Sequence, residues 1–405
     1  MSTSTSSNHN QPHIAIIGGG PGGLVTLLTL SKRGIPATLY ERDASRTARV
    51  HLGGMLDLDW ESGQRALREN GMEDSFRKYS RRDAEEMRIC GKDGVPIFHE
   101  ESPEPDADDL RHARPEIDRR VLLDVLHDAV PQDAIKWGHA LASIKPLEDG
   151  RHELTFANGA VVVADVVVGA DGAHSRIRPL LSSATPIYHG VTGAEISLPA
   201  AAAALPENRD INEGVGKGTC MLAQDEKIVA LQRNGDGRIR AYVWHRTTLD
   251  WALPRDPKEA KKVLHELCAD WAPWVHQFIE QADEAAIYPR PLFHLPVGHR
   301  WAHKSGLTLI GDAAHLMSPF AGAGANLAMR DGLDIGLVLA DAVSKGLDWK
   351  QRDAAVAAWE EGMFARVEPE AAITAQNLEA FMGPGAPHSA LKAMQDAMAQ
   401  AGAQQ

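Results

Sequence analysis

The chain has 405 residues, of which 43% are hydrophobic, so it is long enough for two domains or one large discontinuous domain around a sizeable core. Its net charge of −13 and its pI of about 5.8 argue against a surface for nucleic acid or anionic membranes. The three cysteines, Cys90, Cys220 and Cys268, lie far apart without CxxC or paired Cys/His spacing. They favour neither a disulfide framework nor a zinc site, and we expect no metal and a reducing compartment.

The first residues carry no pattern typical of a targeting signal. Residues 1–12, MSTSTSSNHNQP, are polar and lack the apolar core of a signal peptide. No apolar run approaches the roughly 20 residues that span a bilayer. We therefore expect a cytoplasmic monomer with no membrane span and no nucleic-acid partner.

The first elements in chain order predict a βαβ unit. Residues 13–17 are apolar and β-branched, the glycines of GGGPGG follow, and residues 24–30 continue with helical periodicity up to a stop at Gly34. Residues 35–40 indicate a second strand that ends at Glu41. A strand, a glycine turn, a helix and a strand within about thirty residues favour parallel pairing with a right-handed crossover.

The glycine turn has the pattern GxGxxG, made by Gly18, Gly20 and Gly23. Gly18 permits the tight turn, Gly20 lets a pyrophosphate approach the backbone, and Gly23 allows the helix to pack closely on the strand. Glu41 follows Gly18 by 23 positions, where an acid can bind ribose hydroxyls and disfavour a 2′-phosphate. The alternative is a glycine-rich turn with an incidental acid, and the register of strand, helix and acid argues against it.

Beyond residue 60 the pattern alternates between helices and short strands. Helical periodicity predicts helices over residues 60–79, 119–130 and 257–282. Apolar runs between turn residues predict strands within residues 86–112, 135–168 and 187–246. In the second of these ranges we expect three strands, IKWGHALASI, HELTFANG and VVVADVVVGA.

An apolar strand returns at residues 307–310, and the chain after it is mostly helical. This order predicts a discontinuous nucleotide domain interrupted by a second, mostly β, domain.

Two later motifs follow strand-like runs. In GADGAHSRIR, Asp171 and Gly172 end a strand, and Arg176 and Arg178 can bring cations near phosphates, although the motif alone also fits an ordinary strand-to-helix turn.

In LIGDAAHLMSPFAGAGAN, Asp312 lies just past a strand end, where a carboxylate can accept hydrogen bonds from a sugar or polyol. The alternative role for Asp312 is the N-cap of the next helix. The backbone around Pro319, Gly322 and Gly324 can face an anionic ring edge or a phosphate.

Taken together, GGGPGG with Glu41, GADGAHSR and LIGDAAHLMSPFAGAGAN resemble the class A flavoprotein monooxygenases, which have the para-hydroxybenzoate hydroxylase fold. The resemblance covers most of residues 13–345. The segments YERDASRTARVHLGGMLDL and RPEIDRRVLL are most similar to the flavin-dependent tetracycline-inactivating monooxygenases and their relatives.

The resemblance implies an α/β fold, with a discontinuous Rossmann-like FAD-binding domain, an inserted mostly-β substrate domain and a C-terminal helix. The implied FAD-binding domain comprises residues 1–75, 113–178 and 287–350. The implied substrate domain comprises residues 76–112 and 179–286, and the C-terminal helical segment residues 351–405.

The resemblance further implies bound FAD, NADPH or NADH as reductant and O₂ as co-substrate. In it, Glu41 binds the adenosine ribose, Asp312 binds ribityl or ribose hydroxyls, and Arg49 is the counterpart of a residue implicated with the nicotinamide cofactor. The full set of implied cofactor-binding residues is Gly18, Gly20, Gly23, Glu41, Arg42, Arg49, Asp57, Arg119, Asp171, Gly172, Asp312, Pro319, Gly322, Gly324, Ala325 and Asn326.

Met221, Trp244 and Phe320 are candidates for the substrate pocket wall, with ordinary core as the alternative. Alignment with the tetracycline enzymes leaves Gly193 and Cys220 where those proteins use polar or cationic substrate contacts. A site that hydrogen-bonds its substrate discriminates strongly through those bonds. We therefore do not expect tetracycline to be the natural substrate.

The activity that the resemblance implies is hydroxylation of an aromatic or polycyclic small molecule through a flavin C4a-hydroperoxide. A flavin-dependent halogenase or reductase on the same fold is an alternative, and the lack of a WxWxIP-type segment lowers the halogenase. A flavoprotein that binds a ligand without turnover is a third possibility. An NAD-dependent dehydrogenase is disfavoured because the chain has no second complete βαβ lobe.

Overall fold

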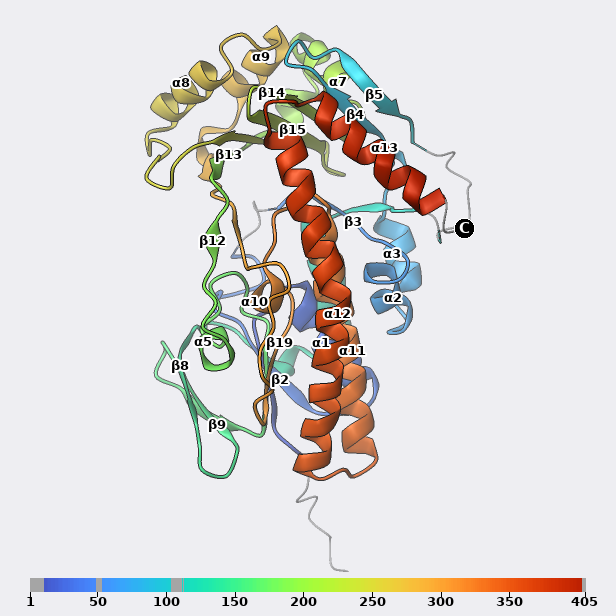
Figure 1. Ribbon diagram of the computed structural model, residues 1–405, viewed down its shortest axis with the longest axis vertical. Helices are drawn as coiled ribbons and strands as arrows, with labels where there is room; N and C mark the ends of the chain where they lie inside the picture. The colour runs from blue at the N-terminus through green and yellow to red at the C-terminus, as the bar shows by residue number, and fades with distance from the viewer. Residues whose placement is uncertain (1–10, 49–52, 103–110, 112, 403–405) are drawn as a thin grey trace, which may run out of the picture.

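A five-stranded parallel sheet forms the centre of the lower part of the molecule in Figure 1, a computed structural model that describes residues 11–48, 53–102, 111 and 113–402. Its strand order is β19 (Leu307–Leu309), β11 (Val166–Gly169), β1 (Ile14–Ile17), β2 (Ala37–Tyr40) and β7 (Ile135–Lys136). The strands β1, β11 and β19 are buried on both faces, as expected for an all-parallel sheet.

The predicted βαβ unit is confirmed. Helix α1 (Pro21–Lys32) connects β1 to β2, which pair in parallel, and β11 and β19 then extend the sheet on the other side of β1. Helices α4 (Arg119–Ala129) and α11 (Ala323–Ser344) contribute buried side chains to the same core. The late strand at residues 307–309 therefore joins the N-terminal domain, which makes this domain discontinuous.

Several predicted strands and helices are shorter than expected. The run VVVADVVVGA is two strands, β10 (Val161–Ala164) and β11, because Asp165 bonds to His13 through both its carboxylate and its backbone N–H. Strand β10 joins the antiparallel sheet β10–β9–β8, with β9 at His152–Phe156 and β8 at Leu141–Pro146. IKWGHALASI likewise divides between β7 and β8, at Gly138 with φ +68°.

The two longest helical predictions are also divided. Residues 60–79 form α2 (Gly63–Arg68) and α3 (Glu73–Tyr79), separated at Gly71, whose φ is +70°. Residues 257–282 form α8 (Pro257–Leu267) and α9 (Pro273–Gln281), and Pro273 starts the second helix because proline fits its first turn.

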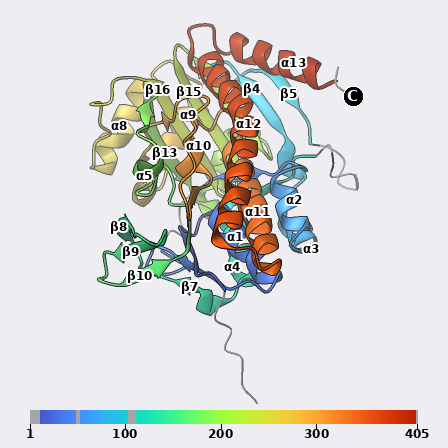
Figure 2. The ribbon, with the colours of Figure 1, turned by 60° about the horizontal axis from the view of Figure 1, so that its bottom comes forward.

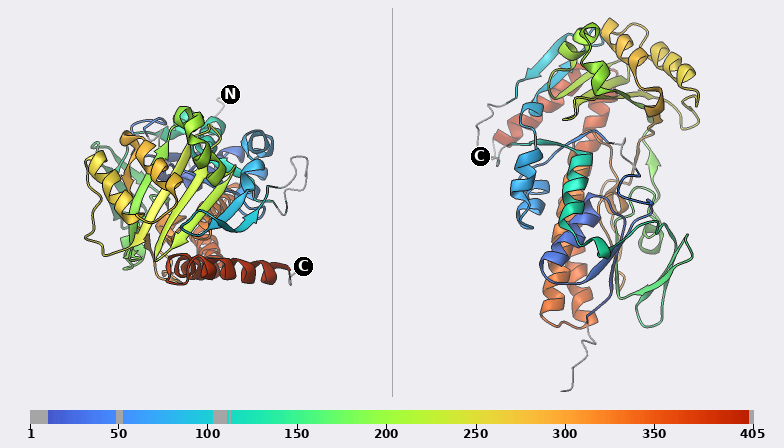
Figure 3. Two further views of the ribbon diagram at one scale, coloured as in Figure 1. Left: turned by 90° about the horizontal axis from the view of Figure 1, so that it is seen from above. Right: turned by 180° about the vertical axis from the view of Figure 1, so that it is seen from behind.

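A seven-stranded sheet forms the upper part of the molecule. Its order is β17 (Tyr288–Pro289), β13 (Val191–Leu198), β16 (Ile239–Arg246), β15 (Lys227–Arg233), β14 (Thr219–Gln224), β4 (Met87–Cys90) and β5 (Pro96–Glu100). All pairs are antiparallel except β14 with β4. One face packs against α7 (Arg209–Val215), α8 and α9, as Figure 3 shows from above. We call this the far face and the opposite one the near face.

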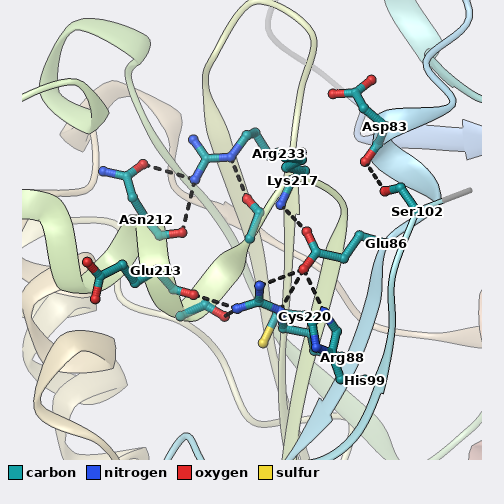
Figure 4. Close-up of polar contacts among 12 residues, drawn as sticks. Asp83, Glu86, Arg88, His99, Ser102, Asn212, Glu213, Lys217, Cys220 and Arg233 are labelled. Carbon is teal, nitrogen blue, oxygen red and sulfur yellow. Dashed lines mark hydrogen bonds and ion pairs between the residues drawn. The ribbon is translucent and has the colours of Figure 1, made fainter. Parts of the chain in front are cut away.

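A polar cluster around Glu86 joins β4 to α7 and β14 (Figure 4). The Glu86 carboxylate accepts hydrogen bonds from Arg88 Nε at 2.9 Å and from the backbone N–H of Lys217 at 2.6 Å, and His99 Nε2 lies 2.9 Å from it. Burial raises the pKa of Glu86, but these hydrogen bonds outweigh that effect and lower it below its usual range. The cluster therefore fixes an edge of the sheet.

Helix α12 (Trp349–Met382) connects the two sheets. Its first half, with Trp359 and Phe364, packs in the core of the parallel sheet, and Leu378 and Phe381 near its end pack on the near face of the seven-stranded sheet. Figures 1 and 2 show it running beside α11 over much of the molecule, and α13 (His388–Gly402) packs back on it. The helix thus braces the two parts of the molecule.

Smaller elements complete the fold. Two-stranded pairs are β3 (Met55–Asp57) with β6 (Glu116–Asp118), and β12 (Ile187–Tyr188) with β18 (Phe293–His294). Short helices are α5 (Arg178–Leu181), α6 (Ala200–Ala203) and α10 (Asp312–His315). Among the described residues, no helix has both the length and the apolar character that a membrane span needs. The α/β fold class agrees with the prediction, and the exact domain boundaries remain predictions.

One buried carboxylate joins α10, α11 and α12. Asp331, fully buried on α11, accepts a hydrogen bond from the backbone N–H of Gly311 at 3.0 Å. It also lies 2.6 Å from His315 Nε2 and 2.8 Å from Arg366 Nη2. Burial raises the pKa of Asp331, but the charges of His315 and Arg366 outweigh burial and hold it below its usual range.

We expect Asp331→Ala to lower the free energy of unfolding by about 3–5 kcal/mol, because it leaves the Arg366 guanidinium, the His315 ring and the Gly311 N–H without their buried carboxylate. Urea unfolding at neutral pH measures this. Since the pKa of Asp331 is depressed in the folded state, its contribution is present above the unfolded pKa and is lost as pH falls below about 4.

The exposed Asp341 on the same helix is the control, and Asp341→Ala should change stability by less than about 0.5 kcal/mol. An Asp331→Ala protein as stable as the control would contradict this account.

Candidate functional site

The glycine turn between β1 and α1 has no room for side chains at two positions. A Cβ on Gly18, whose φ is +112°, would lie 2.2 Å from the carbonyl oxygen of Ala170. A Cβ on Gly23 would lie 2.0 Å from the carbonyl oxygen of Gly18. At Gly20, the N-cap of α1, a Cβ would meet no atom within 4 Å among the described residues. The helix start is therefore open above Gly20, as an approaching phosphate requires.

Glu41 closes this turn from the end of β2. Its carboxylate accepts hydrogen bonds from the backbone N–H groups of Gly19 at 2.6 Å and Asp43 at 2.9 Å. The side chain of Arg42 is exposed beside it. Both predicted residues thus lie at the glycine turn, whereas Arg49 falls outside the described residues.

The second motif turns its polar groups inward. Asp171 accepts a hydrogen bond from the backbone N–H of Arg176 at 2.8 Å, and its other oxygen has no hydrogen-bond partner among the described residues. Burial raises the pKa of Asp171, opposed by hydrogen bonds within the loop. Gly172 has a φ of +78° and completes the turn.

Arg178 has a different role from the one we expected of it. It is buried, and its guanidinium donates to the carbonyl oxygens of Ala313 at 2.8 Å, Ala173 at 2.8 Å and Asp312 at 3.2 Å. The hydrogen bonds that the Arg178 guanidinium makes in the described part of the chain all go to backbone oxygens, so it is not simply a cation held ready for a phosphate. Instead it ties the GADG loop to the loop that carries Asp312.

The third motif begins with a left-handed glycine. Gly311, with φ +58°, is the N-cap of α10, and Asp312 follows as an exposed first residue without a side-chain capping bond. The alternative that Asp312 caps this helix is therefore wrong. Its carboxylate stays accessible at the carboxyl end of β19.

Gly322 begins α11 in the left-handed conformation, with φ +63°. A Cβ there would lie 2.8 Å from Oδ1 of Asp57, which itself pairs with Arg114 at 2.5 Å. At Gly324 a Cβ would meet no atom within 4 Å in the described part of the chain. Pro319 is exposed ahead of this turn, and Ala325 is half-buried in the first helical turn.

Asn326 holds β3 against α11. Its Nδ2 donates to the carbonyl oxygen of Asp57 at 2.7 Å, and its Oδ1 accepts from the backbone N–H groups of Asp59 at 3.1 Å and Gly63 at 3.2 Å. The side chain is 2% exposed, so its described contacts are all with the protein. Arg119 is exposed at the start of α4, and a Cβ on Gly53 would lie 2.7 Å from Cδ of its side chain.

The three motifs meet because two helices approach closely. A Cβ on Gly22 of α1 would lie 2.7 Å from the carbonyl oxygen of Ala328, and one on Gly332 of α11 would lie 2.3 Å from the carbonyl oxygen of Gly22. The glycine turn, the GADG loop and the Gly311–Gly324 segment therefore gather at the carboxyl ends of β1, β11 and β19. Ligands of parallel α/β sheets bind at this edge.

The three predicted substrate residues also come together. Trp244 on the near face stacks on Tyr242 at 4.9 Å between ring centroids and lies 5.8 Å from the ring of Phe320. Met221 packs in the same apolar cluster, which Phe381 of α12 closes. The near face of the sheet is thus apolar next to the Phe320 loop. A direct role of these residues in substrate binding remains a prediction.

Cys220 does not lie on the near face, although alignment placed it where the tetracycline enzymes have substrate contacts. It is fully buried on the far face of the sheet, 3.8 Å from the Sγ of Cys90, and it packs in the core with α7 and α9. Side chains alternate along a strand, so its neighbour Met221 occupies the near face instead. Of the two aligned positions, only Gly193, opposite Trp244, therefore still favours a substrate other than tetracycline.

Sequence reasoning missed three residues that hold the motifs together, Asp331, Gly22 and Gly332, and it gave Arg178 a different role. One available signal was the pair Gly332 and Gly336, four residues apart on one face of a helix, which indicates close packing against another backbone.

Comparisons with known proteins agree with this geometry. A family model described as the FAD binding domain matches residues 12–359. The monooxygenase asqM of Emericella nidulans is 30% identical over 375 residues, covering 80% of this chain and 82% of that protein. The 3-amino-4-hydroxybenzoate 2-monooxygenase PtmB3 of Streptomyces platensis is 30% identical over 336 residues, covering 81% and 79%.

Solved structures show the same fold at lower identity. Klebsiella pneumoniae HpxO, complexed with FAD and uric acid, superposes with a TM-score of 0.74 at 20% identity, covering 94% of this chain and 91% of that one. The tetracycline destructase Tet(51) gives a TM-score of 0.67 at 20% identity and 95% coverage of both chains. With a matching family model over most of its length, this chain belongs to the FAD binding domain family and is a class A flavoprotein monooxygenase, an FAD-dependent oxidoreductase.

Proposed function

We propose that this enzyme uses NADPH or NADH and O₂ to hydroxylate an aromatic or polycyclic small molecule. The observation that carries the proposal is the convergence of the glycine turn, the Asp312 loop and the Gly322 turn beside an apolar sheet face. The glycine turn, the Asp312 loop and the Gly322 turn would hold the cofactor, and the apolar sheet face would hold the organic substrate.

The residues present fit FAD. Gly20 and Gly324 leave open space above the backbone at two helix starts, where N–H groups favour anionic groups. Asp171 keeps one buried oxygen without a hydrogen-bond partner among the described residues. We assign the pyrophosphate to Gly18, Gly20 and Gly23, the ribose and ribityl hydroxyls to Glu41 and Asp312, and the flavin edge to Pro319, Gly322, Gly324 and Asp57.

When bound, FAD supplies the redox chemistry, taking reducing equivalents from the nicotinamide and passing them to O₂. The chain then has to orient the substrate and exclude water. Trp244, Phe320 and Phe381 form a continuous run of ring contacts between the sheet and α12, which keeps the near face apolar. Water exclusion also strengthens each polar contact made there.

The absorbance spectrum of the purified protein tests the proposal first. We expect a yellow protein with bound FAD, and NADPH or NADH consumption that an aromatic or polycyclic substrate stimulates. The product should have gained one oxygen atom. A halogenated or reduced product would favour the alternative chemistries, and a colourless protein that takes up no FAD would exclude the proposal.

Gly20 and Gly23 provide a matched pair of substitutions. Gly20→Ala should weaken FAD binding by about tenfold or more, since its methyl enters the expected phosphate position, while changing stability by less than about 1 kcal/mol. Gly23→Ala should lower the free energy of unfolding by about 1–3 kcal/mol, because its Cβ meets the carbonyl oxygen of Gly18.

Flavin fluorescence titration gives the FAD Kd, and urea unfolding of the FAD-free proteins gives their stability. Equal FAD affinity in Gly20→Ala and the parent protein would contradict the placement of the pyrophosphate.

Asp57 makes this site sensitive to pH. Burial raises the pKa of Asp57 to about 6, although the charge of Arg114 opposes the shift. Glu116 lies opposite Asp57 in the β3–β6 pair, and burial together with the charge of Asp57 raises its pKa as well. The folded state therefore favours the protonated form of Asp57, and its contribution to stability is lost as pH rises from about 4 through about 6.

We expect Asp57→Asn to gain stability relative to the parent protein between pH 4 and neutral pH, by about 2 kcal/mol after allowance for the 27% exposure of the Asp57 side chain. Chemical unfolding of the FAD-free proteins at several pH values measures the difference. Asp341→Asn, at an exposed position, is the control. A stability difference that does not change with pH would show that Asp57 is ionised throughout.

A further inference from the structure

A polar cluster shares the near face of the seven-stranded sheet with the apolar residues. The β13–β16 register places Gly193 opposite Trp244 and Glu195 opposite Tyr242. Side chains of one face recur at every second position, so Glu195 and Arg240 belong to the face that carries Trp244. The proposed substrate side of the sheet therefore contains charged groups.

Glu195 divides its single negative charge between two arginines. One carboxylate oxygen accepts a hydrogen bond from Nη1 of Arg240. The other lies 2.6 Å from both Nε and Nη2 of Arg290. The side chains of Glu195 and Arg240 are 3% and 4% exposed, whereas that of Arg290 is 33% exposed. Arg290 is thus the member of the cluster that presents its charge beyond the sheet.

The backbone of Arg290 lies at the edge of the Trp244 ring. Trp244 Nε1 donates to the carbonyl oxygen of Arg290 at 3.1 Å, and the Arg290 N–H donates to the carbonyl oxygen of Gly193 at 2.9 Å. A guanidinium has five N–H donors. Two of those of Arg290 bind Glu195 and a third makes a long bond of 3.3 Å to Pro289. In the described part of the chain, the others are left for a further acceptor.

We propose that the substrate is an organic anion and that Arg290 selects it by binding its charged oxygen at the edge of Trp244. This inference rests on the proposed function, which places the reacting molecule against Trp244 and Phe320. Glu195 orients the guanidinium through two contacts, and the N–H groups of Arg290 that bond to neither Glu195 nor Pro289 can bind a single oxygen of a carboxylate, phenolate or enolate.

The overall charge makes a local cation necessary for such a ligand. At −13 the chain as a whole repels anions, so long-range steering cannot select one. A charged oxygen that bonds to a partly buried guanidinium gains a charge-assisted hydrogen bond. A neutral analogue of the same shape can still accept a hydrogen bond but loses the attraction between opposite charges, and a site built this way discriminates between the two.

Calorimetric titration of the FAD-loaded enzyme with matched ligands tests the proposal. The first pair is 2-naphthoate and its neutral amide, 2-naphthamide. The second pair is 4-nitrophenol, ionised at alkaline pH, and its methyl ether 4-nitroanisole, which separates a phenolate from a carboxylate. We expect at least one anion to bind about tenfold more tightly than its neutral partner.

Variants of the cluster assign the preference to Arg290. Arg290→Gln should reduce the anion preference to less than about twofold, and Arg290→Lys should retain part of it, because lysine keeps the charge. Glu195→Gln should increase the preference, since it removes the competing carboxylate. If Glu195→Gln prevents folding, Arg290→Gln and Arg290→Lys still test whether Arg290 causes the anion preference. Arg300→Gln, at an arginine half-exposed on the surface, is the control and should leave binding unchanged.

The outcomes separate this inference from the proposed function. Equal binding of anion and neutral partner in the parent enzyme, binding of no anion from either pair, or a preference that survives in Arg290→Gln, would each overturn the role of Arg290. Bound FAD and nicotinamide oxidation would still support the monooxygenase in those cases. A protein without FAD would instead exclude the proposed function, whatever the ligands do.

Discussion

The close approach of backbone to backbone around α1 is the constraint on which the rest of this structure depends. Gly18 lies against Ala170, Gly23 against Gly18, and Gly22 against both Ala328 and Gly332. At each of these contacts a single Cβ would collide with a carbonyl group. Three segments from distant parts of the sequence can meet at one sheet edge because none of them projects a side chain there.

Buried charged groups then hold together the segments that the glycines allow to meet. Arg178 binds carbonyl oxygens of both the GADG loop and the Asp312 loop, and Asp331 binds the Gly311 N–H together with His315 and Arg366. Each of these buried groups is paired with charges or backbone dipoles of the opposite sign, which offsets its desolvation. At the same edge, a Cβ on Gly20 or Gly324 would meet no described atom within 4 Å and Asp312 is exposed, so these three positions are left open for the FAD that we propose binds there.

The sequence predicted the parts of this site that have a local signature. A strand followed by GxGxxG and an acid specifies a turn within one segment, and Gly311 and Gly322 adopt the left-handed conformations that favour glycine. What it could not predict depends on contacts across long stretches of chain. Arg178 was expected to meet phosphates because two of its carbonyl partners, those of Ala313 and Asp312, lie more than a hundred residues away. Cys220 was aligned with substrate-contacting positions because a one-residue offset in a strand reverses the face. The Glu195–Arg290 pair, 95 residues apart, had no local signal at all.

The central claim is that the glycine turn, the GADG loop and the Gly311–Gly324 segment bind one FAD together. Hydrogen–deuterium exchange of the full-length protein, with FAD bound and after its removal, tests this most directly. The account predicts that FAD slows exchange in residues 18–24, 169–173 and 311–326 in the same experiment. Slower exchange confined to one of these segments, with the other two unchanged, would contradict it.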